Sequence, residues 1–252
     1  ELGRSKTFKV TSCVRPWFRS FHFSWFSFFL AFTGWFAIVP ALSYIEEGDN
    51  GITKSDIKTS NILSVMMTIF VRFSMGPLCE NFGARRIQCC LLGFGALFVA
   101  LSSMIDNVTQ LLVLRSFIGL IGGAFVPCQY WTTMMFASNV VGSANAFAGG
   151  WGNLGGGFAN IFGGVMITVL RSVGLEDNVA WRVYMAIPST AMLLLIIPMW
   201  MYSDDCPQGK WDYKLYNKQS PKNKINHYSE GFGDWRVWIL ALQYGCSLGI
   251  EL

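Results

Sequence analysis

A single arginine lies in the middle of an apolar stretch of the chain, "SVMMTIFVRFSMGPLC". Arg72 has eight largely apolar residues before it and seven after it in this stretch. At the centre of a membrane helix an arginine costs about 2.5–3.5 kcal/mol, and such residues usually face a water-filled path or a partner. The guanidinium is a planar fork of donors that matches an oxyanion, so Arg72 is a candidate ligand for an anionic substrate. In the alternative interpretation, its long side chain snorkels to the membrane surface near Glu80.

A second polar residue, Asn153, stands among six glycines in "AGGWGNLGGG". On a helix, the residues three and four positions away share its face, and all four of them are glycine. Glycine weakens a helix in water by about 1 kcal/mol, but small residues let membrane helices approach closely. Two interpretations stay open: a packing face on which Asn153 hydrogen-bonds a neighbouring helix, or a smooth surface where a small ligand reaches the amide. The six glycines are Gly149, Gly150, Gly152, Gly155, Gly156 and Gly157.

An aromatic residue, Phe125, lies between glycines and Pro127 in "GLIGGAFVPCQYWTTMMF". Proline lacks a backbone N–H, so we expect Pro127 to interrupt the normal helix hydrogen bonds near Phe125. The ring is a candidate to pack against a small planar anion, although a phenylalanine taken alone is more commonly part of a core. Arg115 opens the same apolar stretch near its other end, where we expect an interfacial or pairing role.

The elements that position these residues follow from the composition. The chain is 52% hydrophobic and 13% charged, with a mean hydropathy of +0.40. Soluble domains carry roughly 25% charged residues, and a soluble fold this apolar would expose large apolar patches. Several stretches reach the ~20 apolar residues that cross a bilayer and are too long for ~10-residue barrel strands. We therefore predict an all-α polytopic membrane protein, because only helices and closed barrels satisfy their backbone in lipid.

Six complete spans and the start of a seventh are expected. A protein rarely ends inside a span, so we expect this sequence, which stops within "WILALQYGCSLGIEL", to lack its C-terminal part. The chain then divides into an N-terminal arm (1–22), a six-helix bundle (23–202), a linker (203–234) and a truncated seventh helix (235–252). The six spans are Phe23–Tyr44, Ser60–Cys79, Ile87–Ile105, Gln110–Phe136, Val140–Leu170 and Trp181–Tyr202.

The basic residues indicate how the spans are oriented. Lys and Arg gather in the arm, in the turn after the second span and in the linker, which lie on one side if the spans alternate. Such residues favour the cytoplasmic side, so we expect the N-terminus and a flexible, polar linker there. This pattern accounts for the net charge of +4 without any nucleic acid partner. The seven cysteines have no metal-ligand spacing with the histidines, so we expect no metal and no other cofactor. Nothing in the sequence arranges a nucleophile or an acid–base pair, so we expect no enzymatic activity.

Together, these motifs resemble the nitrate/nitrite porter branch of the major facilitator superfamily, and its eukaryotic high-affinity nitrate transporters in particular. The stretch "AGGWGNLGGG" is similar to the nitrate signature of that family's fifth helix, which is the most specific match. The stretches "FHFSWFSFF", "CQYWTTMMF", "DDCPQGKW" and "WILALQYGCSLGIEL" also resemble the family. In "GPLCENFGARR", Gly76, Glu80, Gly83 and Arg85 fit the loop that follows the second span in major facilitators, G-x-x-x-[DE]-x-x-G-x-R. Such a loop can lock neighbouring helix ends until the bundle rocks.

The resemblance implies two six-helix halves with the substrate bound between them. Arg72 matches the family's nitrate-binding arginine, Asn153 its signature asparagine and Phe125 the aromatic residue that packs on the substrate, while the second half of the site would lie beyond Leu252. The resemblance further implies proton-coupled transport of nitrate or nitrite at the plasma membrane, by alternating access. It also implies a C-terminal half and a possible accessory subunit as protein partners. Glu251 is the one acidic residue expected at mid-depth, so it is the candidate proton acceptor, with a structural pair to a helix of the other half as an equal alternative.

Two other functions stay open at this point. One is a nitrate sensor or an inactive half-transporter, which would keep the site without moving the ion. The other is a major facilitator for another anion, such as phosphate or an organic acid. A larger substrate needs a wider and more polar cavity, whereas a glycine-lined surface with one arginine favours a small anion.

Overall fold

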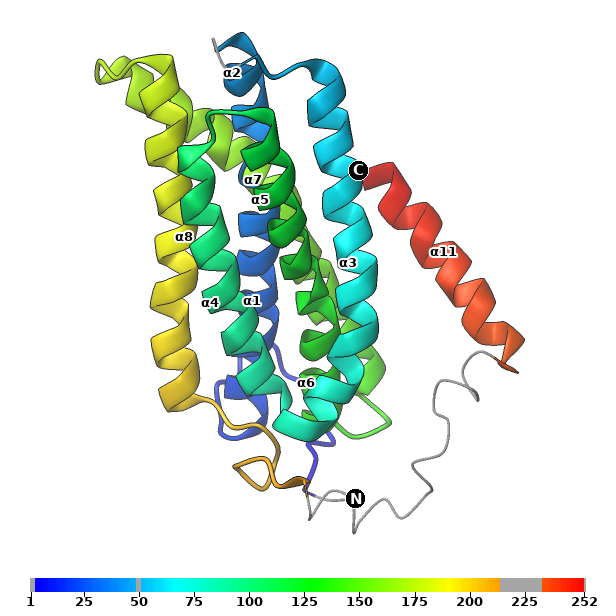
Figure 1. The fold of residues 1–252 in the computed structure, drawn as a ribbon. Helices are drawn as coiled ribbons and strands as arrows, with labels where there is room; N and C mark the ends of the chain where they lie inside the picture. Colours follow the sequence, from blue (N-terminus) through cyan, green and yellow to red (C-terminus); the bar gives the residue numbers. More distant parts are fainter. Residues whose placement is uncertain (1–2, 49–50, 214–232, 252) are drawn as a thin grey trace. The chain divides into compact units, whose positions relative to one another are not determined.

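The computed structural model describes residues 3–48, 51–213 and 233–251, without the side chains of 244 and 247–251. The contacts divide the chain into two units, 1–211 and 212–252, and each is described by itself. The described secondary structure is helical apart from two isolated backbone bridges. The first unit is a bundle of long helices (Figure 1).

The helices agree with the predicted class of fold. Six helical stretches of the described residues are long and apolar enough to cross a membrane. The prediction of an all-α membrane protein with six spans is therefore confirmed. The helices of the first unit are α1 (Trp17–Phe36), η1 (Val39–Ala41), α2 (Leu42–Glu47), α3 (Lys54–Phe82), α4 (Ala84–Leu101), η2 (Ser102–Met104), α5 (Val108–Gly119), η3 (Leu120–Ala124), α6 (Phe125–Met135), α7 (Val141–Ser172) and α8 (Asp177–Tyr202), and the second unit contains α11 (Trp235–Glu251).

Most of the spanning helices begin earlier than their apolar stretches predict, and α1 and α3 begin earliest relative to them. Helix α3 begins at Lys54 because Thr53 and Asp56 form a capping box, in which each side chain bonds the other residue's backbone N–H. Its first turns are polar and lie before the expected span, Ser60–Cys79. Helix α1 begins at Trp17, so the end of the expected arm is already helical.

The fourth span is one continuous crossing with a tightened segment in its middle. The 3-10 helix η3 joins α5 to α6, and Pro127 lies in the first turn of α6. Glycine allows close packing just before this point. A Cβ atom at Gly119 would lie only 2.2 Å from the carbonyl oxygen of Ser64, so α5 and α3 touch through their backbones.

Helix α1 forms the inside of the bundle, packed against α7, α6 and α8 (Figure 1). Its buried face carries aromatic rings, such as Phe21, Phe28 and Phe32. Small hydroxyl groups also tie the helices together: Ser24 Oγ donates to the Cys128 carbonyl at 3.1 Å. In lipid, close packing and such hydrogen bonds, averaging about 0.6 kcal/mol each, replace the hydrophobic effect as the force between helices.

Candidate functional site

Arg72 lies half-buried on α3, where its side chain turns toward the middle of the fourth span. The Nε atom donates a hydrogen bond to the Gly122 carbonyl of η3 at 3.2 Å. The Cβ position of Gly122 lies against Thr68, one turn before Arg72 on α3. The guanidinium is therefore held against η3, the tightened segment of the fourth span. The bond to Gly122 favours a partner inside the bundle over snorkelling to the surface near Glu80, which stays an open alternative.

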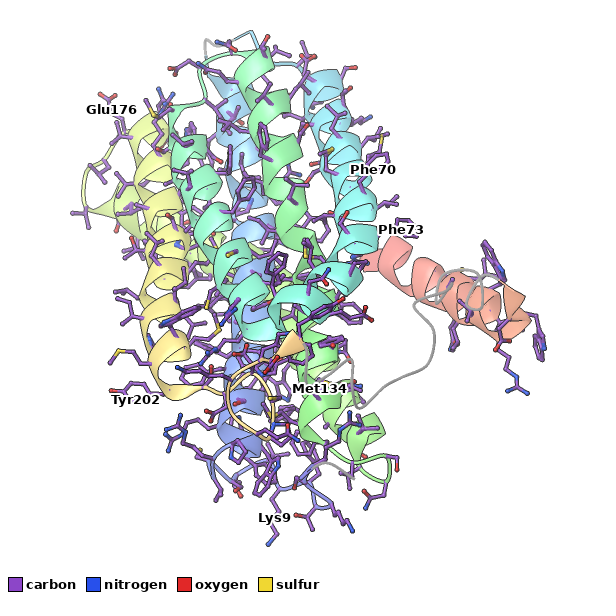
Figure 2. The ribbon with its side chains drawn as sticks, turned by 60° about the horizontal axis from the view of Figure 1, so that its bottom comes forward. Lys9, Phe70, Phe73, Met134, Glu176 and Tyr202 are labelled. Carbon is purple, nitrogen blue, oxygen red and sulfur yellow. The ribbon has the colours of Figure 1, made fainter. Side chains whose placement is uncertain are left out.

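The face of α3 that points away from the bundle is apolar on both sides of Arg72. Phe70 and Phe73 are 62% and 57% exposed. Figure 2 shows both rings on the outer side of the helix. These two rings offer the arginine no polar partner, whereas its contacts with Gly122 and Phe125 lie toward η3 and α6.

Phe125 is the first residue of α6 and connects Arg72 to the core. The Cζ atom of Arg72 lies 5.7 Å from the centroid of the Phe125 ring, within the range of a cation–π contact. The same ring packs edge-to-face on Phe28 of α1, with centroids 5.6 Å apart. A Cβ atom at Gly149 of α7 would lie 3.8 Å from Phe125 Cε2. The Phe125 ring is thus the point where α3, α1, α6 and α7 meet.

The glycines of α7 divide between two faces of the helix. Cβ atoms at Gly152 and Gly155 would lie 1.8 Å from Phe28 Cδ1 and 2.2 Å from the Phe29 carbonyl oxygen, so these two glycines let α7 lie directly on α1. Gly156 faces Phe36 at 3.2 Å. Cβ atoms at Gly150 and Gly157 would have no neighbour within 4 Å among the described residues. One face of α7 is therefore packed on α1, while the face that carries Gly150 and Gly157 is open toward the described residues.

Asn153 lies on α7 at the boundary between these two faces. It is half-buried, and its Oδ1 atom is shielded from solvent without a hydrogen-bond partner among the described residues. The bond to a neighbouring helix that the packing interpretation expects for this oxygen is therefore not formed within the described part of the chain. Asn153 is one turn along α7 from Gly149, which faces Phe125.

Of the three predicted site residues, the structure brings Arg72 and Phe125 into contact and places Asn153 on the adjoining helix. Two residues near them were not singled out from the sequence. Phe28 supports the Phe125 ring, and Gln129 Nε2 donates to the Asn145 carbonyl at 3.2 Å, beside Gly149. Both lie in stretches that carry the family resemblance, which was the available signal.

The predicted conformational loop lies between α3 and α4. Gly83 has a φ of +86°, a conformation that favours glycine, and its Cβ position would lie 2.9 Å from Trp211 Cβ. Arg85 Nη2 forms an ion pair with Asp205 Oδ2 at 2.9 Å, and Arg85 Nη1 donates to the Ser203 carbonyl at 2.6 Å. The loop is therefore fastened to the segment that follows α8. Gly76, by contrast, has open space at its Cβ position.

The segment Ser203–Trp211 thus departs from the expected flexible linker. Trp211 Nε1 donates to the Glu80 carbonyl at 3.0 Å, and Trp131 Nε1 donates to the Asp204 carbonyl at 2.8 Å. The segment packs on the bundle because its tryptophan and acidic residues find partners there. Burial raises the pKa of Asp205, an effect that outweighs the opposing attraction of Arg85.

Arg115 and Glu251 are two other charged residues of the apolar stretches. Arg115 is only 5% exposed; its Nη1 reaches the Trp35 carbonyl at 3.5 Å, and its Nη2 bonds Asn61 Oδ1. It has a pairing role inside the bundle rather than an interfacial one. Glu251, the candidate proton acceptor, is the last residue of α11, and its side chain lies outside the described residues.

Comparison with known proteins gives the family. The sequence profile of the Major Facilitator Superfamily matches residues 24–250. High affinity nitrate transporter 2.5 of Arabidopsis thaliana is 35% identical over 253 residues, which are 99% of this chain and 50% of that protein. High-affinity nitrate transporter 2.3 of Oryza sativa subsp. japonica is 35% identical over 99% of this chain and 48% of its own length.

A more distant relative is the nitrate/nitrite transporter NrtP of Nostoc punctiforme, which is 28% identical over 77% of this chain and 38% of its own length. The chain spans about half the length of the first two relatives. These similarities confirm the resemblance that the motifs indicated. With its profile matched over nearly the whole sequence and six helices able to cross a membrane, the chain belongs to the major facilitator superfamily.

Proposed function

We propose that this chain forms the N-terminal half of a transporter for nitrate, and for the similarly small and planar nitrite. The observation that carries the proposal is the contact between the Arg72 guanidinium and the Phe125 ring in the middle of the bundle. The names of the relatives, which are nitrate transporters, support the same substrate.

The chemistry of the two groups suits a planar anion with one negative charge. A guanidinium donates two parallel hydrogen bonds to two oxygens of such an anion, and this geometry is stronger and more selective than a point charge. The ring of Phe125 offers a flat apolar surface beside it. The side-chain amide of Asn153 is the adjoining polar group, and the open glycine face of α7 leaves room for the ion to reach it.

The transport cycle that we propose needs a second six-helix half, which supplies the opposite wall of the site. Alternating access then arises as the two halves rock around the bound ion. Import of an anion against an inside-negative potential costs about 2.3 kcal/mol per charge and 100 mV, so coupling to protons would supply the driving force. We place the protein in the plasma membrane with its N-terminus in the cytoplasm, and we propose a transporter rather than an enzyme.

The proposal is tested by uptake of isotopically labelled nitrate into cells that express the full-length protein containing this chain. Arg72→Lys keeps the charge but removes the fork, and we expect uptake at limiting nitrate to fall by about tenfold or more, as for the loss of a charge-assisted hydrogen bond. Arg171→Lys is the matched control, because Arg171 is an exposed partner of Asp177 at the end of α7. The amount of protein at the cell surface is measured for each variant.

Three results would contradict the proposal. Undiminished uptake by Arg72→Lys would remove the arginine from the site. Binding of nitrate that depends on Arg72, without uptake, would identify a sensor. Stronger competition by phosphate than by nitrite would indicate a carrier for another anion.

A further inference from the structure

A cavity of about 650 Å³ opens where the first turns of α1 lie beside the end of α8. It is lined mainly by aromatic side chains: Phe23, Trp25 and Phe26 of α1, and Tyr202 at the end of α8. Arg19, His22 and the thiol of Cys13 complete its wall. Tyr202 can be located in Figure 2 at the foot of α8. We call this cavity the α1–α8 groove.

One wall of the groove is held in place by hydrogen bonds. His22 Nδ1 accepts from Trp25 Nε1 at 3.0 Å, and the other ring nitrogen, Nε2, lies 3.0 Å from the Ser12 carbonyl, to which it donates. The Trp25 ring also packs on Phe147 and Trp151 of α7, with centroids 6.1 and 5.9 Å away. The aromatic surface therefore exists before any ligand binds.

The charge at the groove comes from Arg19. Its guanidinium has no hydrogen bond or ion pair to the residues that the structure describes, whereas Arg15, one turn earlier, is paired with Asp204 at 3.1 Å. Exposed Lys9, labelled in Figure 2, adds to the positive charge of the N-terminal arm. The groove thus combines an uncompensated cation with an apolar wall.

The dimensions of this arrangement match the boundary of a membrane. Arg19 is in the first turn of α1, and Phe26 follows two turns later, about 10 Å further along the helix axis at 1.5 Å per residue. Phe26 and Tyr202 are 39% and 50% exposed, so their rings face outward. Basic and aromatic side chains are enriched at the level of the lipid headgroups, and basic pockets between membrane helices bind anionic headgroups.

We propose that the α1–α8 groove binds one anionic phospholipid, with its phosphate on Arg19 and the start of one acyl chain along Phe23 and Phe26. The uncompensated charge of Arg19 selects an anionic headgroup over a zwitterionic one, whose ammonium would be repelled. The linker sequence does not suit this place, because it is rich in lysine and would add positive charge. This site is separate from the proposed nitrate site, so either proposal can fail without the other.

The test uses the full-length protein containing this chain, purified in a mild detergent and examined by native mass spectrometry. Phosphatidylglycerol and phosphatidylcholine with identical acyl chains are titrated separately. We expect one phosphatidylglycerol molecule to be retained at concentrations where phosphatidylcholine is not. Arg19→Gln should weaken this binding by about tenfold or more, since a charge-assisted hydrogen bond is lost. Arg86→Gln is the matched control: Arg86 is exposed in the first turn of α4 and does not line the groove, and we expect no change.

A second variant tests the acyl chain. Phe26→Ser leaves the charge unchanged and should also weaken retention of phosphatidylglycerol, while soluble glycerol phosphate should not compete with the lipid. Equal retention of the two lipids, or equal losses in Arg19→Gln and Arg86→Gln, would overturn the proposal, as would effective competition by glycerol phosphate. The thermal unfolding midpoint of each variant shows whether its fold is retained.

Discussion

The contact between α1 and α7 can be tested with a single methyl group at Gly155. A Cβ atom there would lie 2.2 Å from the carbonyl oxygen of Phe29, whereas ordinary van der Waals contact begins at 3.4 Å. Because a backbone carbonyl cannot rotate away, Gly155→Ala must push the two helices apart. The variant also disturbs the hydrogen bond from Thr33 Oγ1 to the Gly155 carbonyl, which is 3.3 Å long. Gly152 is a weaker test, because the clashing atom there belongs to the side chain of Phe28.

The expected magnitude follows from two opposing effects. Overpacking a closely packed contact costs about 1–3 kcal/mol, and a clash with backbone belongs at the upper end of that range. Alanine returns about 1 kcal/mol through its better helix propensity. The net loss in the free energy of unfolding is therefore about 2 kcal/mol. For a chain of this size, that loss lowers the thermal midpoint by about 4–8 °C.

The matched control is Gly157→Ala on the same helix. A Cβ atom at Gly157 has no neighbour within 4 Å in the described part of the chain, so this variant carries the helix-propensity gain without a clash there. We expect its midpoint to equal or exceed that of the wild type when the 252-residue chain is heated in detergent. Equal midpoints for Gly155→Ala and Gly157→Ala would refute the close backbone packing of α7 on α1.

Two further predictions concern the loop between α3 and α4. Gly83→Ala should lower the thermal midpoint, because φ is +86° and the new methyl group would lie 2.9 Å from Trp211 Cβ. Gly76→Ala is the control, because the Cβ position of Gly76 is open toward the described residues. Equal midpoints for the two variants would contradict the packing of Gly83 on Trp211. The raised pKa of Asp205 means that the folded chain holds this proton more tightly than the unfolded chain. Acidification from neutral pH to about pH 4 should therefore raise the midpoint of the wild type relative to Asp205→Asn, and a relative fall would show that the attraction of Arg85 outweighs burial.

The sequence predicted the spans well because the thickness of the bilayer sets how many consecutive apolar residues a spanning helix needs. It predicted their ends less well, since polar residues also continue a helix: Thr53 and Asp56 start α3 by capping, outside the apolar stretch. A disturbance of helix hydrogen bonding was expected near Pro127, and the 3-10 helix η3 lies just before this residue. The position of η3 depends on its packing against α3, and a local sequence pattern does not report contacts between separate helices.

In the candidate site, too, the residue types were predicted from the sequence, whereas the contacts between them were not. The residue types of Arg72 and Phe125 suggested anion chemistry, and their contact depends on two helices that are adjacent only in space. The segment Ser203–Trp211 was expected to be flexible because it is polar, and yet it packs through Trp211 on the Glu80 carbonyl. A hydrogen bond between residues as far apart in the sequence as Trp211 and Glu80 cannot be predicted from composition or periodicity.

The open glycines of α7 remain to be explained by something outside the described bundle. Gly152 and Gly155 are accounted for by α1, since any side chain there would clash. Cβ positions at Gly150 and Gly157 have no neighbour within 4 Å where the structure describes the chain, and alanine would favour the helix by about 1 kcal/mol at each position. Packing within this bundle therefore gives no reason for glycine at these two places. The proposed function supplies one: the facing half and the ion must both approach α7 beside Asn153, and a methyl group at either position would hold them away.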